Sequence, residues 1–354
     1  MTHGDDPMNR YPALRGALLA LVAAALFGAS TPLIQLLGKD VGAWMTAGLL
    51  YAGAAMAGWL TRSHPQREAA LRRAQIPRLL WMALSGAVIG PTLLAWGLQH
   101  TSGAGASLML ALEAVFTVVL AHLLYREQLD RRVALAIALI TLGGAVLVLD
   151  RAGGGAAQML GLLAVLVATL AWGIDNTLSR GLADADPSQV VLAKAALGAG
   201  CSLLIGAASG QAAVSLSAAA GLLLVGATGY GLSLRFYLLA QRAFGAARTA
   251  SVFAAAPFIG AAVALALGDR AFSAGMGVGA ALMLAGVILH LAERHAHEHS
   301  HQALEHEHAH RHDDGHHHHF HDPLPAGPHS HPHRHAATAH HHPHVPDLHH
   351  THHH

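Results

Sequence analysis

Charged residues are scarce in this sequence: Asp, Glu, Lys and Arg make up 12% of its 354 residues, against about 25% in an ordinary soluble domain. Aromatic residues make up 5%, and cysteine occurs once, as Cys201. A single cysteine excludes a disulfide framework and a thiolate metal cage within the chain. The formal net charge of +1 favours no nucleic-acid partner. Hydrophobic residues instead form 53% of the chain, and they occur in long blocks.

These blocks predict membrane-spanning helices. Each is long enough to cross a hydrocarbon layer of about 30 Å as an α-helix. The start of the chain, MTHGDDPMNRYPALRG, lacks the basic n-region and the cleavage site of a secretory signal peptide. We therefore expect an all-α membrane protein with ten transmembrane helices, near residues 14–37, 41–60, 77–99, 103–125, 132–150, 159–182, 188–208, 219–241, 247–267 and 273–293.

Basic residues lie mainly on one side of the predicted membrane. With the N-terminus inside, fourteen arginines flank the inner helix ends, and only Lys39, Arg151 and Arg270 flank the outer ends. Cytoplasmic loops of membrane proteins collect lysine and arginine. The asymmetry predicts a bacterial-type inner (plasma) membrane protein with both termini in the cytoplasm.

The sequence also repeats itself. Residues 103–149 align without gaps with residues 245–291, and residues 16–30 align with 161–175. Because each repeat would hold five helices, an odd number, the second copy must enter the membrane from the opposite side. The predicted organisation is a cytoplasmic N-terminal segment, a first five-helix repeat, an outer linker, a second five-helix repeat and a His-rich tail, at residues 1–13, 14–150, 151–158, 159–293 and 294–354.

Inverted repeats are typical of secondary transporters, in which two similar bundles rock around a site near the membrane midplane. The alternative is a duplicated scaffold without a transport role, but such proteins rarely need inverted pseudo-symmetry. No hydrolase, nucleotide-binding or redox motif occurs, and the glycines of residues 151–158 fit a linker better than a phosphate loop. The pattern therefore indicates a transporter and not an enzyme.

Four segments of the membrane part resemble the drug/metabolite transporter superfamily, specifically its EamA-like family: LFGASTPLIQLLG, LEAVFTVVLAHLLYREQL, LAWGIDNTLSRGL and GAARTASVFAAAPFIGAAVALALGDR. The resemblance covers residues 14–293. It implies a carrier of small molecules, often an exporter, with an acid ending a helix in each half, here Glu127 and Asp269. Many relatives have proline where this chain has Glu113-Ala114, and the histidine tail is not a general family feature.

Glu113 lies near the middle of the predicted fourth helix, in an otherwise apolar run. A charge at a helix centre costs on the order of 3 kcal/mol on insertion scales, so such residues usually face an interior cavity. Burial disfavours the ionised form of a carboxylic acid, which suits the group to loading and releasing a proton. Two interpretations stay open: a carboxylate that binds a proton or a substrate cation, or a neutral glutamate that ties two helices together.

Asp175 and Lys194 fall at equal depth on the consecutive helices 159–182 and 188–208. Equal depth predicts a buried ion pair, with either a structural role or a role in gating and substrate binding. Asn176 could add a hydrogen bond to either residue. Glu113, Asp175, Asn176 and Lys194 are therefore the predicted substrate- or proton-binding residues.

Histidine is concentrated at the C-terminus, where it makes up 26 of the last 60 residues. An alternating pattern places four imidazoles on one side of an extended chain in two segments, at His295, His297, His299 and His301, and at His306, His308, His310 and His312. Imidazole suits Zn²⁺, Ni²⁺, Co²⁺ and Cu²⁺, so these residues are the predicted metal ligands. The composition predicts disorder without metal. A cellular role for metal binding and a role in pH sensing both stay open.

Three functions compete. The first is a secondary transporter that moves a small metabolite or drug-like solute outward by alternating access, with proton coupling as an option. The outward direction follows from the resemblance, because members of the family are often exporters. The second is a divalent transition-metal (Ni, Co or Zn) exporter whose tail buffers or senses metal, although His100, His122 and His290 are scattered. The third, a membrane-tethered metal store, would leave ten helices unused. We expect no required cofactor. The expected partners are a small-molecule solute, the lipid bilayer and, for the tail, transition-metal ions. The sequence favours no oligomeric state.

Overall fold

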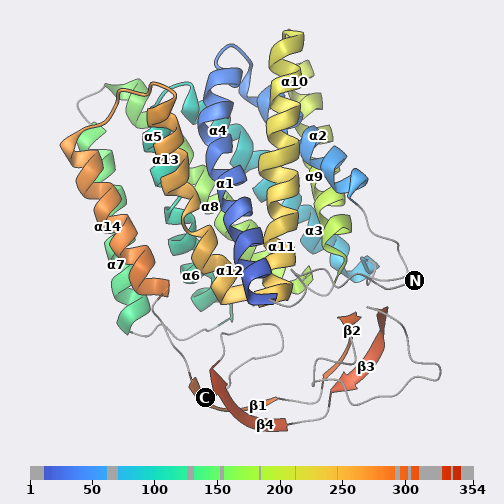
Figure 1. Cartoon of the computed structure of the whole chain (residues 1–354). Helices are drawn as coiled ribbons and strands as arrows, with labels where there is room; N and C mark the ends of the chain where they lie inside the picture. The colour runs from blue at the N-terminus through green and yellow to red at the C-terminus, as the bar shows by residue number, and fades with distance from the viewer. Residues whose placement is uncertain are drawn as a thin grey trace, which may run out of the picture.

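The computed structural model describes residues 12–61, 71–125, 131–151, 155–182, 185–211, 213–244, 246–291, 296–301, 304–310, 329–335 and 338–343. Its membrane part is helical (Figure 1). The first half contains α1 (Pro12–Gly38), α2 (Ala43–Leu60), η3 (Arg73–Gln75), α3 (Ile76–Met82), η4 (Ala83–Ile89), α4 (Gly90–Leu98), α5 (Gly103–Met109), α6 (Leu112–Tyr125) and α7 (Arg131–Arg151). The second half contains α8 (Ala156–Ser179), η6 (Arg180–Leu182), α9 (Pro187–Ala208), α10 (Leu216–Val225), η7 (Gly226–Leu232), α11 (Ser233–Phe244), α12 (Ala246–Phe253), α13 (Ala256–Ala266) and α14 (Ala274–Leu291).

Helix occupies all ten of the stretches that the sequence predicted. Within the described residues, eight helical segments are long and apolar enough to cross a membrane, and Ala274–His290 is a shorter apolar helix. Large apolar side chains such as Leu149, Leu204 and Leu224 face outward, where hydrocarbon would cover them. The chain is thus a multi-pass membrane protein, and the count of ten crossings stays a prediction.

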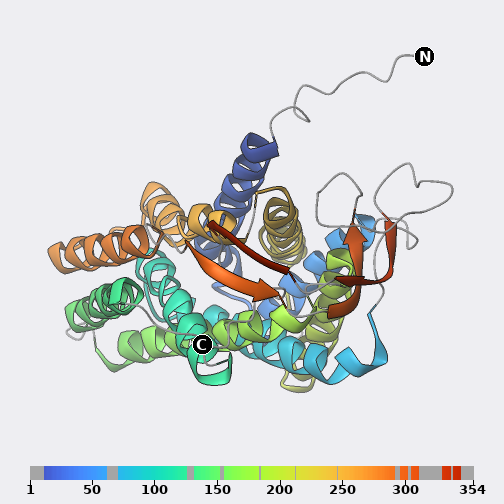
Figure 2. The same ribbon diagram turned by 90° about the horizontal axis from the view of Figure 1, so that it is seen from below.

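The two halves pack with equivalent helices antiparallel, as an inverted repeat requires. In α7 and α14, Gly143 lies against Gly279 while Ala136 lies against Gly286, so the contacts run in opposite directions along the two helices. The same holds for α2 and α9, where Gly48 meets Leu203 and Gly58 meets Leu192. The absence of side chains at these glycines lets the backbones approach closely. Figures 1 and 2 both show α7 and α14 side by side at one edge of the bundle.

One end of the bundle carries the start of α1 and the end of α14 (Figure 1). We call it the tail end, and the opposite end the far end. At the far end, α5 begins where Ser102 accepts a hydrogen bond from the amide of Gly105, at 3.0 Å. The Asp269 carboxylate accepts another from the amide of Ala104, at 2.9 Å. Both bonds satisfy amides that a helix N-terminus leaves unpaired, so Asp269 has a local structural role. Glu127, its counterpart, lies outside the described residues.

The third helix of each half contains a seven-residue π-helix, η4 in the first half and η7 in the second. Pro91 is the second residue after η4 and stands in the first turn of α4. In η7 there is no proline; instead Gly229 and Gly231 pack closely on Ser30 and Ala57. Such π-segments are rare and occur often at functional sites. Neither was predicted, because a π-helix shares its apolar pattern with the α-helix around it.

The fourth helix is broken, contrary to the single helix predicted over residues 103–125. It divides at Leu110 and Ala111 into α5 and α6, and the equivalent ninth helix divides at Ala254 and Ala255 into α12 and α13. The break places Glu113 in the first turn of α6. A carboxylate is stabilised there by the positive end of the helix dipole. The local backbone therefore favours an acid at this depth.

The tail contains four short strands. Ala296–His301 (β1) pairs antiparallel with Thr338–Pro343 (β4), and Leu304–His310 (β2) pairs with His329–His335 (β3); Figure 2 shows them across the tail end. The disorder predicted for the metal-free tail as a whole stays a prediction. Alternating histidine has the two-residue period of an extended chain, and pairing satisfies the backbone groups. The predicted ligands His295 and His312 lie outside the described residues, and the other six fall in β1 and β2.

Candidate functional site

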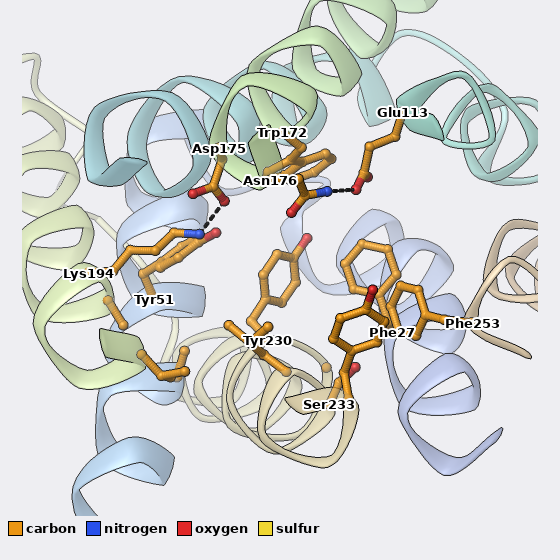
Figure 3. Close-up of a pocket in the computed structure, with 16 residues that line it drawn as sticks. Phe27, Tyr51, Glu113, Trp172, Asp175, Asn176, Lys194, Tyr230, Ser233 and Phe253 are labelled. Atoms are coloured by element: carbon orange, nitrogen blue, oxygen red, sulfur yellow. Dashed lines mark hydrogen bonds and ion pairs between the residues drawn. The ribbon is translucent and has the colours of Figure 1, made fainter. Parts of the chain in front are cut away.

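A cavity of about 180 Å³ lies between the two halves of the bundle (Figure 3). Its wall includes all four predicted substrate- or proton-binding residues, Glu113, Asp175, Asn176 and Lys194. Asp175 and Asn176 stand close to the end of α8, and Lys194 stands in the second turn of α9. These are the parts of both helices nearest the tail end. The cavity thus occupies the tail-end half of the bundle.

Asp175 and Lys194 form the predicted ion pair, through the Lys194 Nζ and Asp175 Oδ2 atoms. Both residues are buried, at 4% and 8% exposure. The pair fits because residue 86 is glycine: a Cβ atom there would lie 2.8 Å from the Cβ atom of Asp175. The second oxygen, Oδ1, is buried and has no hydrogen-bond partner among the described residues. One oxygen of Asp175 therefore lacks a hydrogen-bond donor within the described part of the chain.

Glu113 faces the same cavity from α6 and has a neutral partner. The Asn176 Nδ2 atom donates a hydrogen bond of 2.5 Å to Glu113 Oε1 (Figure 3). We had expected Asn176 to bond Asp175 or Lys194, and the structure corrects this. Residues 175 and 176 project in different directions from a helix, about 100° apart. Asn176 consequently turns toward α6 while Asp175 turns toward α9.

The carbonyl group of Gly86, in η4, is the meeting point of two aromatic side chains. The Tyr51 hydroxyl donates to it, and the Trp172 Nε1 atom donates at 2.9 Å. In a π-helix the donor to this carbonyl would be the amide of residue 91, but Pro91 has no N–H. The proline thus leaves an acceptor that fixes Tyr51 from α2 and Trp172 from α8. These two hydrogen bonds connect the two halves at the wall of the cavity.

Aromatic residues form half of the remaining wall, six of its twelve residues, and sequence reasoning missed them. Phe27 lies at their centre, with its ring centroid 6.4 Å from Trp172, 5.8 Å from Tyr230 and 5.6 Å from Phe253. Tyr237 packs edge-on against Phe253, at 4.9 Å. The internal repeat carried a signal: the alignment of 16–30 with 161–175 sets Phe27 against Trp172. Paired aromatics in an aromatic-poor chain could have indicated a shared wall.

At the far end of the bundle, two glutamine side chains bond backbone groups of neighbouring segments. Gln35 donates to the carbonyls of Leu98 and Thr101, at 3.1 and 2.9 Å. Gln99 donates to the carbonyls of Gly38 and Val41, at 3.0 and 2.8 Å. These bonds join α1 to the loop between α4 and α5.

The sequence model of the EamA-like transporter family matches both halves of the chain, at residues 14–149 and 159–292. The chain belongs to the EamA-like transporter family. An uncharacterized transporter of Methanothermobacter thermautotrophicus is 29% identical over 232 residues, which cover 63% of this chain and 67% of that protein. A solved structure described only as "Crystal structure of protein" aligns with a TM-score of 0.56 and 18% identity, over 78% of this chain and 98% of that chain; this likeness shows a shared fold. The family resemblance read from the sequence is confirmed, and this EamA-like protein is a membrane transporter.

Proposed function

We propose that this EamA-like transporter exports a small solute by alternating access, with the solute bound in the cavity and proton coupling at Glu113. The observation that carries the proposal is that Glu113 and the Asp175–Lys194 pair line one cavity between the repeats. Binding sites of inverted-repeat transporters lie at this interface. Ionisable residues within the membrane usually mark a pathway.

Glu113 is better suited to coupling than the ion pair. Its partner Asn176 is neutral, so a proton can be gained or lost without leaving an opposite charge unpaired. Asp175 is bound to Lys194, and separating a buried pair by removing one partner's charge is strongly unfavourable. Glu113 therefore changes its charge during the cycle, while the pair stays neutral overall.

The position of the cavity supports an inward-facing state. It occupies the tail-end half, whereas at the far end Gln35 and Gln99 tie α1 to the loop between α4 and α5. The distribution of arginine places the tail end in the cytoplasm. Solute would then load from the cytoplasm, and the far-end hydrogen bonds would break when the transporter opens outward. We place the protein in the inner membrane with both termini cytoplasmic on the same grounds.

Flux in proteoliposomes tests the proposal. Solutes that the wild-type protein moves are screened with an imposed pH gradient, and Glu113→Gln is measured beside Asp40→Asn. Asp40 is an exposed carboxylate, with 84% of its side chain accessible, and its partner is the equally superficial Lys39. We expect Glu113→Gln to lose gradient-driven flux and Asp40→Asn to keep it. Wild-type flux and pH dependence in Glu113→Gln would refute the coupling role.

The metal-exporter alternative receives no support from the membrane part. Across the described residues, no group of three or more His, Cys, Asp or Glu side chains is placed to hold a metal ion. The aromatic wall and the single acid–base pair suit an organic solute better. Metal binding by the tail is a separate prediction, and its test is given below.

A further inference from the structure

We propose that the solute is a small primary amine, carried as an ammonium ion on an apolar body the size of one ring. This inference rests on the transport function proposed above and names the class of its cargo. It follows from three properties of the cavity: the balance of its charges, the arrangement of its aromatic rings and its volume.

The charged groups of the cavity leave one anion without a cationic partner. Of the described residues that line it, Lys194 is the cationic one, and it is already bound to Asp175. Within the described residues, the carboxylate of Glu113 accepts one hydrogen bond, from the amide of Asn176. When all three groups are ionised, the site carries one excess negative charge. A monocation neutralises that charge, and an ammonium group forms a stronger hydrogen bond with a carboxylate than a neutral amide does.

Aromatic rings share the wall of the cavity with this carboxylate. Phe27 contacts Tyr230, Trp172 and Phe253 at ring-centroid distances of 5.6 to 6.4 Å, and Figure 3 shows the rings of Phe27 and Phe253 across the cavity from Glu113. A cation over the face of such a ring within about 6 Å is attracted to it. The same rings accept an apolar body. The site therefore joins a carboxylate for the ammonium group with an aromatic surface for the rest of the solute.

The volume limits the body to about one ring. A cavity of about 150 Å³ lined by apolar side chains holds benzene, and the volume here is about 180 Å³. A six-membered ring with a short aminoalkyl chain fits these dimensions. Larger polycyclic cations do not fit unless the bundle opens further.

A carboxylate on the solute is disfavoured, which separates amines from the matching amino acids. A solute carboxylate would need Lys194, whose single positive charge already neutralises Asp175. Asp175 is 4% exposed and already has one oxygen without a hydrogen-bond partner among the described residues. Loss of Lys194 would leave a fully unpaired buried anion. The ion pair thus acts as a selectivity element against acids.

The test compares head groups on one body. The purified wild-type protein in detergent is titrated calorimetrically with 2-phenylethylamine, L-phenylalanine, 3-phenylpropionate and 2-phenylethanol, and then with a panel of aliphatic primary amines. We expect the amines to bind at least about tenfold more tightly than the acid, the alcohol or the amino acid. We also expect amine binding to weaken as the pH falls, because the proton and the ammonium group compete for the Glu113 carboxylate. Glu113→Gln should lose the preference and Asp40→Asn should keep it.

The head-group comparison uses the wild-type protein, so it stands even if Glu113→Gln fails to fold. Preferential binding of the amino acid or the acid would overturn the amine assignment, as would failure of every amine to bind. If another solute class shows flux that depends on Glu113, the transport proposal stands while the amine assignment falls. If amines bind with the stated preference but no gradient drives their flux, the assignment of the site stands while the transport mechanism falls.

Discussion

Replacement of Lys194 by methionine is the most direct test of how the site is held together. Methionine keeps a flexible side chain of similar length and removes the charge. Lys194 Nζ is bound to Asp175 Oδ2 in the structure. The substitution therefore leaves the Asp175 carboxylate without its cation, in a position that is 4% exposed.

The expected loss is large for a single side chain. Removing one partner of a buried ion pair destabilises a protein by about 3–5 kcal/mol. The upper part of this range is expected here, because Asp175 Oδ1 has no hydrogen-bond partner among the described residues to compensate. Adding Asp175→Asn removes the uncompensated charge. The double variant should therefore regain stability, with a coupling energy of about 2 kcal/mol or more between the two sites.

Reversible unfolding in mixed detergent micelles, followed by circular dichroism, measures the free energy of unfolding of each variant. Lys39→Met is the matched control, because Lys39 pairs with Asp40 at the surface and its side chain is 73% exposed. Exposed pairs contribute about 1 kcal/mol or less. Acidification should recover part of the loss in Lys194→Met, since protonation removes the unpaired charge. Stability within about 0.5 kcal/mol of wild type in Lys194→Met, or simple additivity in the double variant, would refute the reasoning.

Three further predictions follow from other parts of the structure. Gly86→Ala places a carbon 2.8 Å from the Cβ atom of Asp175, and we expect this overpacking to destabilise the protein by about 1–3 kcal/mol and to lower solute flux. The control is Gly200→Ala, which has open space around it and should leave stability and flux unchanged. Asp269→Ala removes the acceptor of two backbone amides, each at 2.9 Å, and should destabilise the protein by about 1–3 kcal/mol; an unchanged melting temperature would contradict the capping role. Truncation after Arg294 should abolish Ni²⁺ binding, measured by calorimetry, and leave solute flux intact, because the strand register sets His306, His308 and His310 opposite His333, His331 and His329. If the truncated protein binds as much Ni²⁺ as the wild type, the tail is not the binding site.

The two repeats share a backbone but not a charge pattern. The alignment of residues 16–30 with 161–175 sets Ser30 against Asp175. Ser30 turns back to its own helix and donates to the carbonyl of Phe27 at 2.6 Å, whereas Asp175 pairs with α9. The charged groups that line the cavity, from both repeats, are thus concentrated in the tail-end half of a nearly symmetric fold. A carrier can alternate by using both halves as gates, while a single set of charged groups binds the solute.

Backbone geometry at the site was beyond the reach of sequence patterns. The break between α5 and α6 falls within a continuous apolar run, where Leu110 and Ala111 carry no turn signal. Pro91 gave a visible sign of a perturbed helix, but η7 has no proline and owes its close packing to glycines that meet α1 and α2. Both features depend on neighbouring helices, so a single-helix pattern could not predict them.

The sequence by itself determined the apolar helices, the duplication and the presence of three ionisable residues at membrane depth. These follow from local quantities, since a hydrocarbon layer admits long apolar helices and penalises charge wherever it occurs. Only the tertiary structure decided which groups meet: Asn176 binds Glu113, Tyr51 and Trp172 both donate to the Gly86 carbonyl, and an aromatic wall completes the cavity. Such contacts join helices far apart in the chain, and their distances depend on how the two halves pack.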